Sequence, residues 1–293
     1  MNSRRSNWLF HAYMAIFLAY LLLPLIVMGG AAFNDSKFPS VYPWVGWTDR
    51  WFLDLWNDGR MWVSFRNTIA VAIAVVAMAV PIGTAAAILI NSLGGVARSA
   101  LYGLMIAPVL TPGAVIGIST LLFWNKFSVP AGLHLSALGQ TSYIAAFVML
   151  LVLARLQSFD RALEEAALDL GATHAQVLRR ILLPHLYPAI IAGAAIAFFQ
   201  SVENFNTTLF TRGTYDTLTV YVFSRVRSGI TPTINALALI LVTMTIVGAL
   251  WYEIARRRQQ ARLAALEAQA RRDERAEEMA VSLASGSVVA AEG

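Results

Sequence analysis

A cluster of polar side chains lies inside an otherwise apolar segment around residue 203. Its members are an acid, amides, hydroxyls and an aromatic ring: Gln200, Ser201, Glu203, Asn204, Phe205, Thr207 and Thr208. A carboxylate at the centre of a membrane helix costs roughly 2.5–3.5 kcal/mol, so such a group usually faces a cavity or a partner. An acid beside amides and aromatic rings suits a polar, cationic solute, because rings attract ammonium groups.

The sequence leaves two uses of this cluster open. On a continuous helix, Gln200, Glu203, Asn204 and Thr207 share one face by their i, i+3 and i+4 spacing, and that face would line a pathway. Alternatively, Glu203 makes a buried polar contact with another helix or pairs with Arg212.

The rest of the sequence contains no constellation typical of an enzyme. There is no Gly-x-x-x-x-Gly-Lys-Ser/Thr phosphate loop, and no nucleophile–base set. His174 and His185 are the only close pair of histidines, and they read as ordinary loop residues. The chain has no cysteine, which excludes disulfides and thiolate metal sites. We therefore predict a chain that is not an enzyme and holds no cofactor.

The elements that position these residues are long apolar helices. Hydrophobic residues make up 58% of the chain and charged residues only 13%, about half the share of a soluble domain. A bilayer core needs roughly 20 apolar residues per helix, and backbone groups find no partners in lipid. The sequence predicts an all-α membrane protein with spans at about 8–33, 66–92, 100–125, 138–157, 186–211 and 233–254. Together these form a six-helix domain over 8–254, after a short N-terminus, 1–7.

The first long connection, residues 34–65, is rich in tryptophan. Aromatic rings favour the headgroup level of a membrane, so a helix lying along the surface is expected over 48–58. The alternative is that part of this segment meets a docking protein.

Prolines and glycines interrupt the second and third spans. Pro108 and Pro112-Gly113 predict a broken helix that either lines a pathway or permits close packing of neighbouring helices.

The loop 158–185, between the fourth and fifth spans, predicts two short helices. Leu163, Ala166, Ala167 and Leu170 form an apolar stripe at helical spacing. Gly171 is a suitable helix stop, since it has no Cβ to resist a left-handed turn. A second helix is expected from about 173 to 183, before Pro184 starts the fifth span. We expect a compact projection at the membrane surface.

After the sixth span the composition changes. Residues 255–293 form a charged tail that we expect to be helical to about 280 and disordered over 281–293. If both termini are cytoplasmic, the cytoplasmic side holds more basic residues than the outer side, as is usual for membrane proteins. We therefore predict that orientation. The positive charge is accordingly a topology signal, and no nucleic-acid motif accompanies it.

The loop and two further segments resemble a known family of permeases. The loop motif is Glu165-Ala166-Ala167, Gly171 and Ile181-x-Leu183-Pro184. This spacing resembles the coupling helix of permease subunits in binding-protein-dependent ABC importers. Ser201-Val202-Glu203-Asn204-Phe205 and the run from Arg227 to Ala236 are most similar to spermidine/putrescine-type inner-membrane permeases.

The resemblance implies partners and a division of labour. A second permease chain, expected to differ from this one, would complete the pathway through the membrane lipid, and a periplasmic binding protein would deliver the solute. Two cytoplasmic ATPase subunits would hold ATP and magnesium. The coupling residues it implies here are Glu164, Glu165, Ala166, Ala167, Asp169, Gly171, Ile181, Leu183 and Pro184. The expected location is a bacterial inner membrane.

One position departs from the family pattern. The segment at 201–205 commonly carries two acids in succession, whereas Glu203 is followed here by the neutral Asn204. This leaves open an amine-bearing, polyamine-like solute, or alternatively an opine, aminoethylphosphonate or another organic solute. A proton-coupled secondary transporter also uses intramembrane acids, but it has no need of the loop motif.

Overall fold

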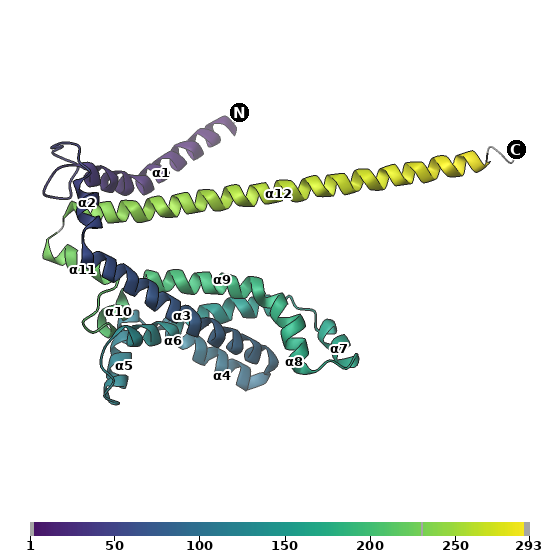
Figure 1. The fold of residues 1–293 in the computed structure, drawn as a ribbon, viewed down its shortest axis with the longest axis horizontal. Helices are drawn as coiled ribbons and strands as arrows, with labels where there is room; N and C mark the ends of the chain where they lie inside the picture. The colour runs from purple at the N-terminus through teal and green to yellow at the C-terminus, as the bar shows by residue number, and fades with distance from the viewer. Residues whose placement is uncertain (1–2, 230, 290–293) are drawn as a thin grey trace. The chain divides into compact units, whose positions relative to one another are not determined.

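The computed structural model of this chain describes residues 3–229 and 231–289, in which the regular elements are all helices and no β-strand occurs. The chain divides into two units, residues 1–51 with 235–293 and residues 52–234, which are considered separately. The helices appear in Figure 1. Side chains are described for residues 8–229, 231–262 and 269.

The first unit contains two long helices. They are α1 (Ser3–Phe33) and most of α12 (Pro232–Val289). Most apolar side chains of α1 are exposed, including Ile16 (71%) and Ile26 (66%), as expected for helices that meet lipid. The connection after α1 is organised by the buried Asn34, whose side chain donates to the carbonyls of Ser40 (2.9 Å) and Pro43 (3.0 Å).

Helix α12 runs further than the sequence suggested. It continues through Val289, so most of the expected disordered end, 281–293, is drawn as helix, and 290–293 lie outside the described residues. Alanine, glutamate and arginine are strong helix formers, which accounts for the extension.

The second unit contains the remaining elements. They are α2 (Arg50–Trp56), α3 (Gly59–Ser92), α4 (Gly95–Ile106), η1 (Ala107–Leu110), α5 (Gly113–Asn125), α6 (Leu133–Leu156), α7 (Arg161–Asp169), α8 (His174–Val177), η2 (Leu178–Leu182), α9 (Leu183–Val202), α10 (Asn206–Thr211) and α11 (Leu218–Ser228). Helix α2 begins in the first unit and occupies most of the range where a surface helix was expected.

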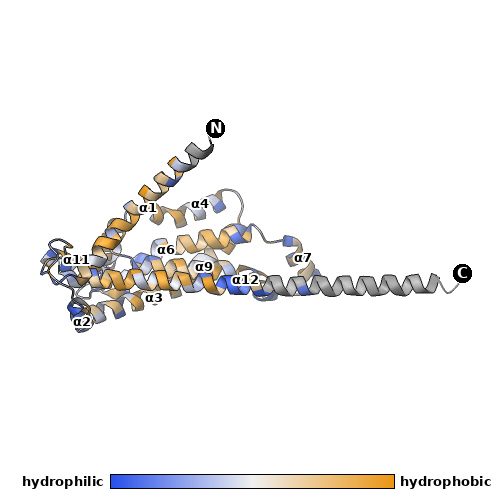
Figure 2. Ribbon diagram, turned by 90° about the horizontal axis from the view of Figure 1, so that it is seen from above, coloured by the Kyte–Doolittle hydropathy of each residue, from blue (hydrophilic) through white to orange (hydrophobic). Residues whose placement is uncertain are grey.

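Five described helices are long and apolar enough to cross a membrane, and a sixth span results if α4–η1 and α5 count as one. That pair is bent by 105°, at the Pro112-Gly113 step, as the broken third span predicted. Apolar residues make up most of α1, α3, α6, α9 and the first part of α12 (Figure 2). The predicted membrane class is therefore confirmed.

The core of the second unit lies where α3, α6 and α9 pack together. Val75, Ile144, Val148, Met149 and Leu186 are fully buried there. Small residues let the helices approach closely: a Cβ placed on Gly83 of α3 would lie 2.5 Å from the Ala145 carbonyl oxygen and 2.9 Å from the Met149 nitrogen. Contacts with backbone atoms leave no side chain that could rotate away.

We expect Gly83→Ala to lower the thermal unfolding midpoint of the purified protein, because the new methyl group must push α3 and α6 apart. Overpacking of this kind costs typically about 1–3 kcal/mol. Gly103→Ala in α4 is the matched control, since its Cβ would meet nothing within 4 Å. The control should be neutral or stabilising, as alanine is favoured over glycine in helices. Equal midpoints for the two variants would contradict the packing argument.

Candidate functional site

The α7–α8 segment forms a projection with a defined joint. Asp160 caps α7 by accepting from the Ala162 N–H (2.9 Å), and Thr173 and Gln176 form a reciprocal capping box at α8. Between the helices Gly171 has φ +85°, and the Ala172 N–H donates to the Ala167 carbonyl (3.0 Å). Two capped ends and a left-handed residue fix the angle between the helices.

The residues singled out by the loop motif lie partly in this projection and partly in the helix that follows it. Glu164, Glu165, Ala166, Ala167 and Asp169 lie on α7, Gly171 in the joint, Ile181 on η2, and Leu183 and Pro184 at the start of α9. Leu163 (55%) and Leu170 (89%) are exposed. A groove of about 300 Å³ runs beside the joint and is lined partly by Gly171, Gln176 and Arg180. Exposed leucines beside a groove suit contact with a protein surface.

The expected second helix of the loop is not separate from the fifth span. α8, the π-helical turn η2 and α9 follow one another without an intervening loop. Pro184 directly follows the π-helical turn η2, an insertion of the kind that lets a helix continue past a proline. It therefore does not interrupt the helix, and the projection is joined directly to α9.

The base of the projection is tied together by Arg155 and His185. The Arg155 Nε donates to the His185 carbonyl (3.1 Å), and the His185 Nε2 lies 3.4 Å from the Arg155 carbonyl. The Phe159 ring contacts the His185 ring with 5.2 Å between centroids. These contacts link the end of α6 to the start of α9.

The fifth span is broken where its charge lies. α9 ends at Val202 and α10 begins at Asn206, so the prediction of one helical face through Gln200, Glu203, Asn204 and Thr207 is wrong. We call residues 203–205 the polar break. The Asn204 Oδ1 accepts from the backbone N–H of Thr208 (3.2 Å) and from its hydroxyl (3.0 Å), which stabilises a new helix start at α10.

A chain of hydrogen bonds surrounds the polar break. Ser201 donates to the Gln140 Oε1 (2.6 Å), and the Gln140 Nε2 donates to the Thr208 hydroxyl (2.8 Å). Asn204 in turn donates to the Tyr143 hydroxyl. Gln140 and Tyr143 belong to α6 and were missed in the sequence, although Gln140 stands out as an amide inside an apolar span.

A cavity of about 250 Å³ adjoins the polar break, and half of its lining residues are polar while the others, such as Ile116 and Phe147, are apolar or glycine. The polar lining residues are Tyr143, Gln200, Asn204 and Asn206, with Thr111 from the bend of the third span. Ser201, Thr207 and Thr208 are buried and join helices instead. Phe205 contacts the Phe223 ring at 4.8 Å.

Glu203 itself is exposed at the end of α9 and forms no ion pair among the described residues. The alternative pairing with Arg212 is not present, because Arg212 pairs with Asp216 (2.6 Å). The carboxylate is therefore available to a partner or solute beyond this chain.

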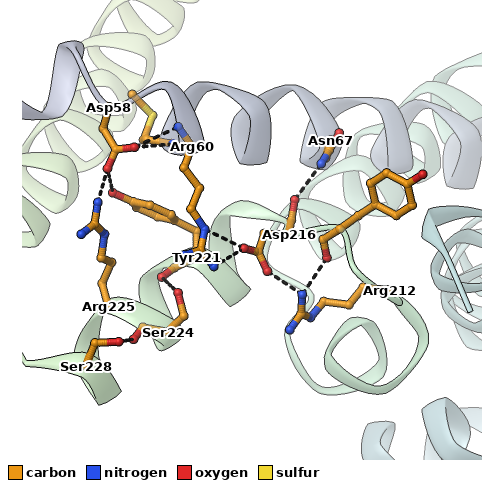
Figure 3. Close-up of polar contacts among 11 residues, drawn as sticks. Asp58, Arg60, Asn67, Arg212, Asp216, Tyr221, Ser224, Arg225 and Ser228 are labelled. Atoms are coloured by element: carbon orange, nitrogen blue, oxygen red, sulfur yellow. Dashed lines mark hydrogen bonds and ion pairs between the residues drawn. The ribbon is translucent and has the colours of Figure 1, made fainter.

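A second polar network holds α11 against the start of α3 (Figure 3). Asp216 binds the guanidinium groups of Arg60 and Arg212, each at 2.6 Å, and the Asn67 side chain donates to its carbonyl (2.9 Å). Asp58 accepts from the Tyr221 hydroxyl (2.7 Å) and pairs with Arg225. We call these contacts the α11 anchor.

The contacts of the α11 anchor stabilise the ionised form of Asp58. Burial opposes the charge of Asp58, but hydrogen bonds from Tyr221, the Met61 backbone and Arg225 outweigh it, so the pKa of Asp58 lies below its usual 3.8. A lowered folded-state pKa gives stability that is present above the unfolded pKa and is lost as the pH falls through the folded one. Asp58 thus keeps its partners from about pH 4 up to the alkaline pH at which Tyr221, whose pKa is raised by burial and by its hydrogen bond to Asp58, loses its proton.

We expect Asp216→Asn to loosen the segment 212–228, because two guanidinium groups lose their shared carboxylate. Removing a charged hydrogen-bond partner costs roughly 1–3 kcal/mol. Hydrogen exchange of this segment measures the change. Asp35→Asn is the control, because the Asp35–Arg50 pair is longer (3.5 Å) and its carboxylate is 45% exposed against 12% for Asp216. If exchange over 212–228 is the same in both variants, the anchor does not hold α11.

This chain is similar to known transport proteins. Residues 79–264 match the family model described as "Binding-protein-dependent transport system inner membrane component". The chain is 35% identical over 266 residues to the putrescine transport system permease protein PotI of Escherichia coli, covering 87% of this chain and 94% of the relative. It is 27% identical over 237 residues to the spermidine/putrescine permease PotC of Haemophilus influenzae, with 80% and 91% covered.

Solved structures share the fold. A bacterial ABC transporter involved in alginate import superposes with a TM-score of 0.68 at 18% identity, covering 87% of this chain and 96% of the other. The MetNI methionine ABC transporter in an inward-facing conformation superposes with a TM-score of 0.53 at 20% identity, covering 66% and 95%.

Proposed function

The chain belongs to the family of inner membrane components of binding-protein-dependent transport systems, and from this membership we propose that it imports a polyamine. It is a multi-pass membrane permease of the ABC-importer type and not an enzyme, since ATP hydrolysis in such importers is done by separate subunits. The cargo class is our proposal. The observation that carries it is the similarity to a putrescine permease along 94% of that relative.

The chemistry around the polar break supports an amine-bearing cargo. Glu203 offers an unpaired carboxylate, and the adjoining cavity offers the amides of Gln200 and Asn206 with the Tyr143 hydroxyl. A primary ammonium group donates three hydrogen bonds, which amide and hydroxyl oxygens accept. A diamine needs a second acid, and we propose that a different partner permease supplies it, because Asn204 is neutral here.

The proposed assembly contains this chain, a second permease, two ATPase subunits that bind ATP and magnesium, and a periplasmic binding protein. Both termini would lie in the cytoplasm. The α7–α8 projection would then face the ATPase and act as the coupling helix, with Glu164, Glu165 and Gly171 at the contact. Exposed Leu163 and Leu170 support this role, since they give the projection an apolar contact surface.

The test is reconstitution of the complex in proteoliposomes with its ATPase and binding protein. We expect ATP-dependent accumulation of radiolabelled putrescine or spermidine that requires both partners. Uptake without the ATPase, driven by a proton gradient, would identify a secondary transporter. Uptake of another solute with no competition by either polyamine would exclude the proposed cargo but keep the importer class.

A further inference from the structure

A cavity of about 500 Å³, twice the volume of the one at the polar break, lies near the C-terminal ends of α3 and α6 and the N-terminal end of α4. α3 ends at Ser92, α4 begins at Gly95 and α6 ends at Leu156, so the cavity is at the end of three spans. This is also the end from which the α7–α8 projection extends, because Gln157 borders the cavity and α7 begins at Arg161. In a membrane, this depth is that of the lipid headgroups.

The cavity lining changes from apolar to polar toward the end of the spans. Along α6 the lining residues are Leu150, Leu153 and Ala154, followed by Gln157 at the helix end. The fully buried Ile90 of α3 adds to the apolar part. A cavity that is apolar toward the membrane interior and polar at its surface matches an amphiphile that lies with its head at the interface.

The polar part carries one positive charge and several further hydrogen-bond donors. Arg98, Ser99 and Tyr102 lie within one turn of α4, opposite Gln157 of α6. Arg98 is exposed and has no acidic partner among the described residues, and no acid lines the cavity. A guanidinium, two hydroxyls and an amide NH₂ can all donate hydrogen bonds. They match the oxygens of a phosphate group, which accept them.

We propose that this cavity binds an anionic glycerophospholipid. Its phosphate lies between Arg98, Ser99, Tyr102 and Gln157, and an acyl chain lies against Leu150 and Leu153. The charge of Arg98 favours an anionic lipid over a zwitterionic one, since basic pockets between membrane helices select acidic headgroups. The apolar lining favours a lipid over free phosphate, which has no group to place there. This proposal concerns the membrane-embedded chain and is independent of the transported solute.

Native mass spectrometry of the assembled complex tests the site. After delipidation, the complex is incubated with phosphatidylglycerol or phosphatidylcholine, with and without millimolar inorganic phosphate. We expect one tightly retained phosphatidylglycerol for each copy of this chain, weaker retention of phosphatidylcholine, and no displacement by inorganic phosphate. Arg98→Gln should reduce phosphatidylglycerol retention about fivefold, the effect of one arginine at an acidic membrane surface. Tyr102→Phe should reduce it less.

The control is Arg258→Gln on α12, which removes the same charge from an exposed residue outside the cavity. It should leave retention unchanged, and equal unfolding midpoints for the two variants exclude misfolding as the cause of lipid loss. The proposal is overturned if Arg98→Gln and Arg258→Gln retain phosphatidylglycerol equally, or if the two lipids are retained equally by the unmodified complex. Displacement by inorganic phosphate would overturn it also, because the site would then be one for a free anion.

Discussion

Replacing Gly171 with valine should abolish uptake while leaving the chain in the membrane. The φ of +85° at this residue is in the left-handed region, where a β-branched side chain is strongly disfavoured. A Cβ here would meet nothing within 4 Å, so the effect acts through the backbone angle and not through a clash. Valine must change that angle, and the relative direction of α7 and α8 changes with it. Uptake in proteoliposomes and recovery in the membrane fraction are the two measurements.

Gly171→Asn separates the backbone effect from side-chain bulk. Asparagine adopts left-handed angles far more readily than valine, and should preserve most of the uptake. The ATPase subunits should still copurify with the asparagine variant and be reduced with the valine variant. Normal transport by the valine variant would show that the joint at Gly171 is not needed for coupling.

Glu203→Gln should reduce uptake of a cationic cargo by about tenfold at subsaturating concentration. Glutamine keeps the size and the hydrogen-bonding groups of the side chain and removes only its charge. Losing one partner of a buried charge pair costs 2–5 kcal/mol, and the exposure of Glu203 places the expected effect below that range, at about 1.4 kcal/mol. Concentration-dependent uptake in the assembled complex measures the change.

Asn204→Asp provides a matched test of the same charge. An aspartate at 204 keeps the oxygen that accepts from Thr208, and Tyr143 becomes the donor in place of the lost amide. In the double variant Glu203→Gln with Asn204→Asp, the single negative charge is moved by one residue, and uptake should partly recover. If Glu203→Gln leaves the concentration dependence unaltered, Glu203 does not contact the cargo.

The sequence predicted best those features that depend on neighbouring residues. Pro112-Gly113 predicted the break in the third span, and Gly171 predicted a stop after α7, because backbone restrictions act within a few residues. The class and the membrane location followed from long apolar runs. These signals need no knowledge of which helices meet.

The sequence did not reveal features that depend on distant partners. The polar break needs Gln140 and Tyr143, each 61 residues before its partner Ser201 or Asn204. The α11 anchor joins Asp58 to Arg225, 167 residues later. The continuous run from α8 into α9 was missed for another reason. Pro184 suggested a boundary, but the π-helical turn η2 just before it lets the helix continue.

The position of α9 has a mechanical consequence. Its 20 residues give a length of about 30 Å between the base tied by Arg155 and His185 and the polar break. Acting as a lever, a rod of that length converts a tilt of about 6° at one end into a displacement of about 3 Å at the other. That distance is about one hydrogen bond. The polar break ends the rod where α10 packs against α5, so we expect small rotations at the projection to open or close the contacts of Ser201 with Gln140 and of Asn204 with Tyr143.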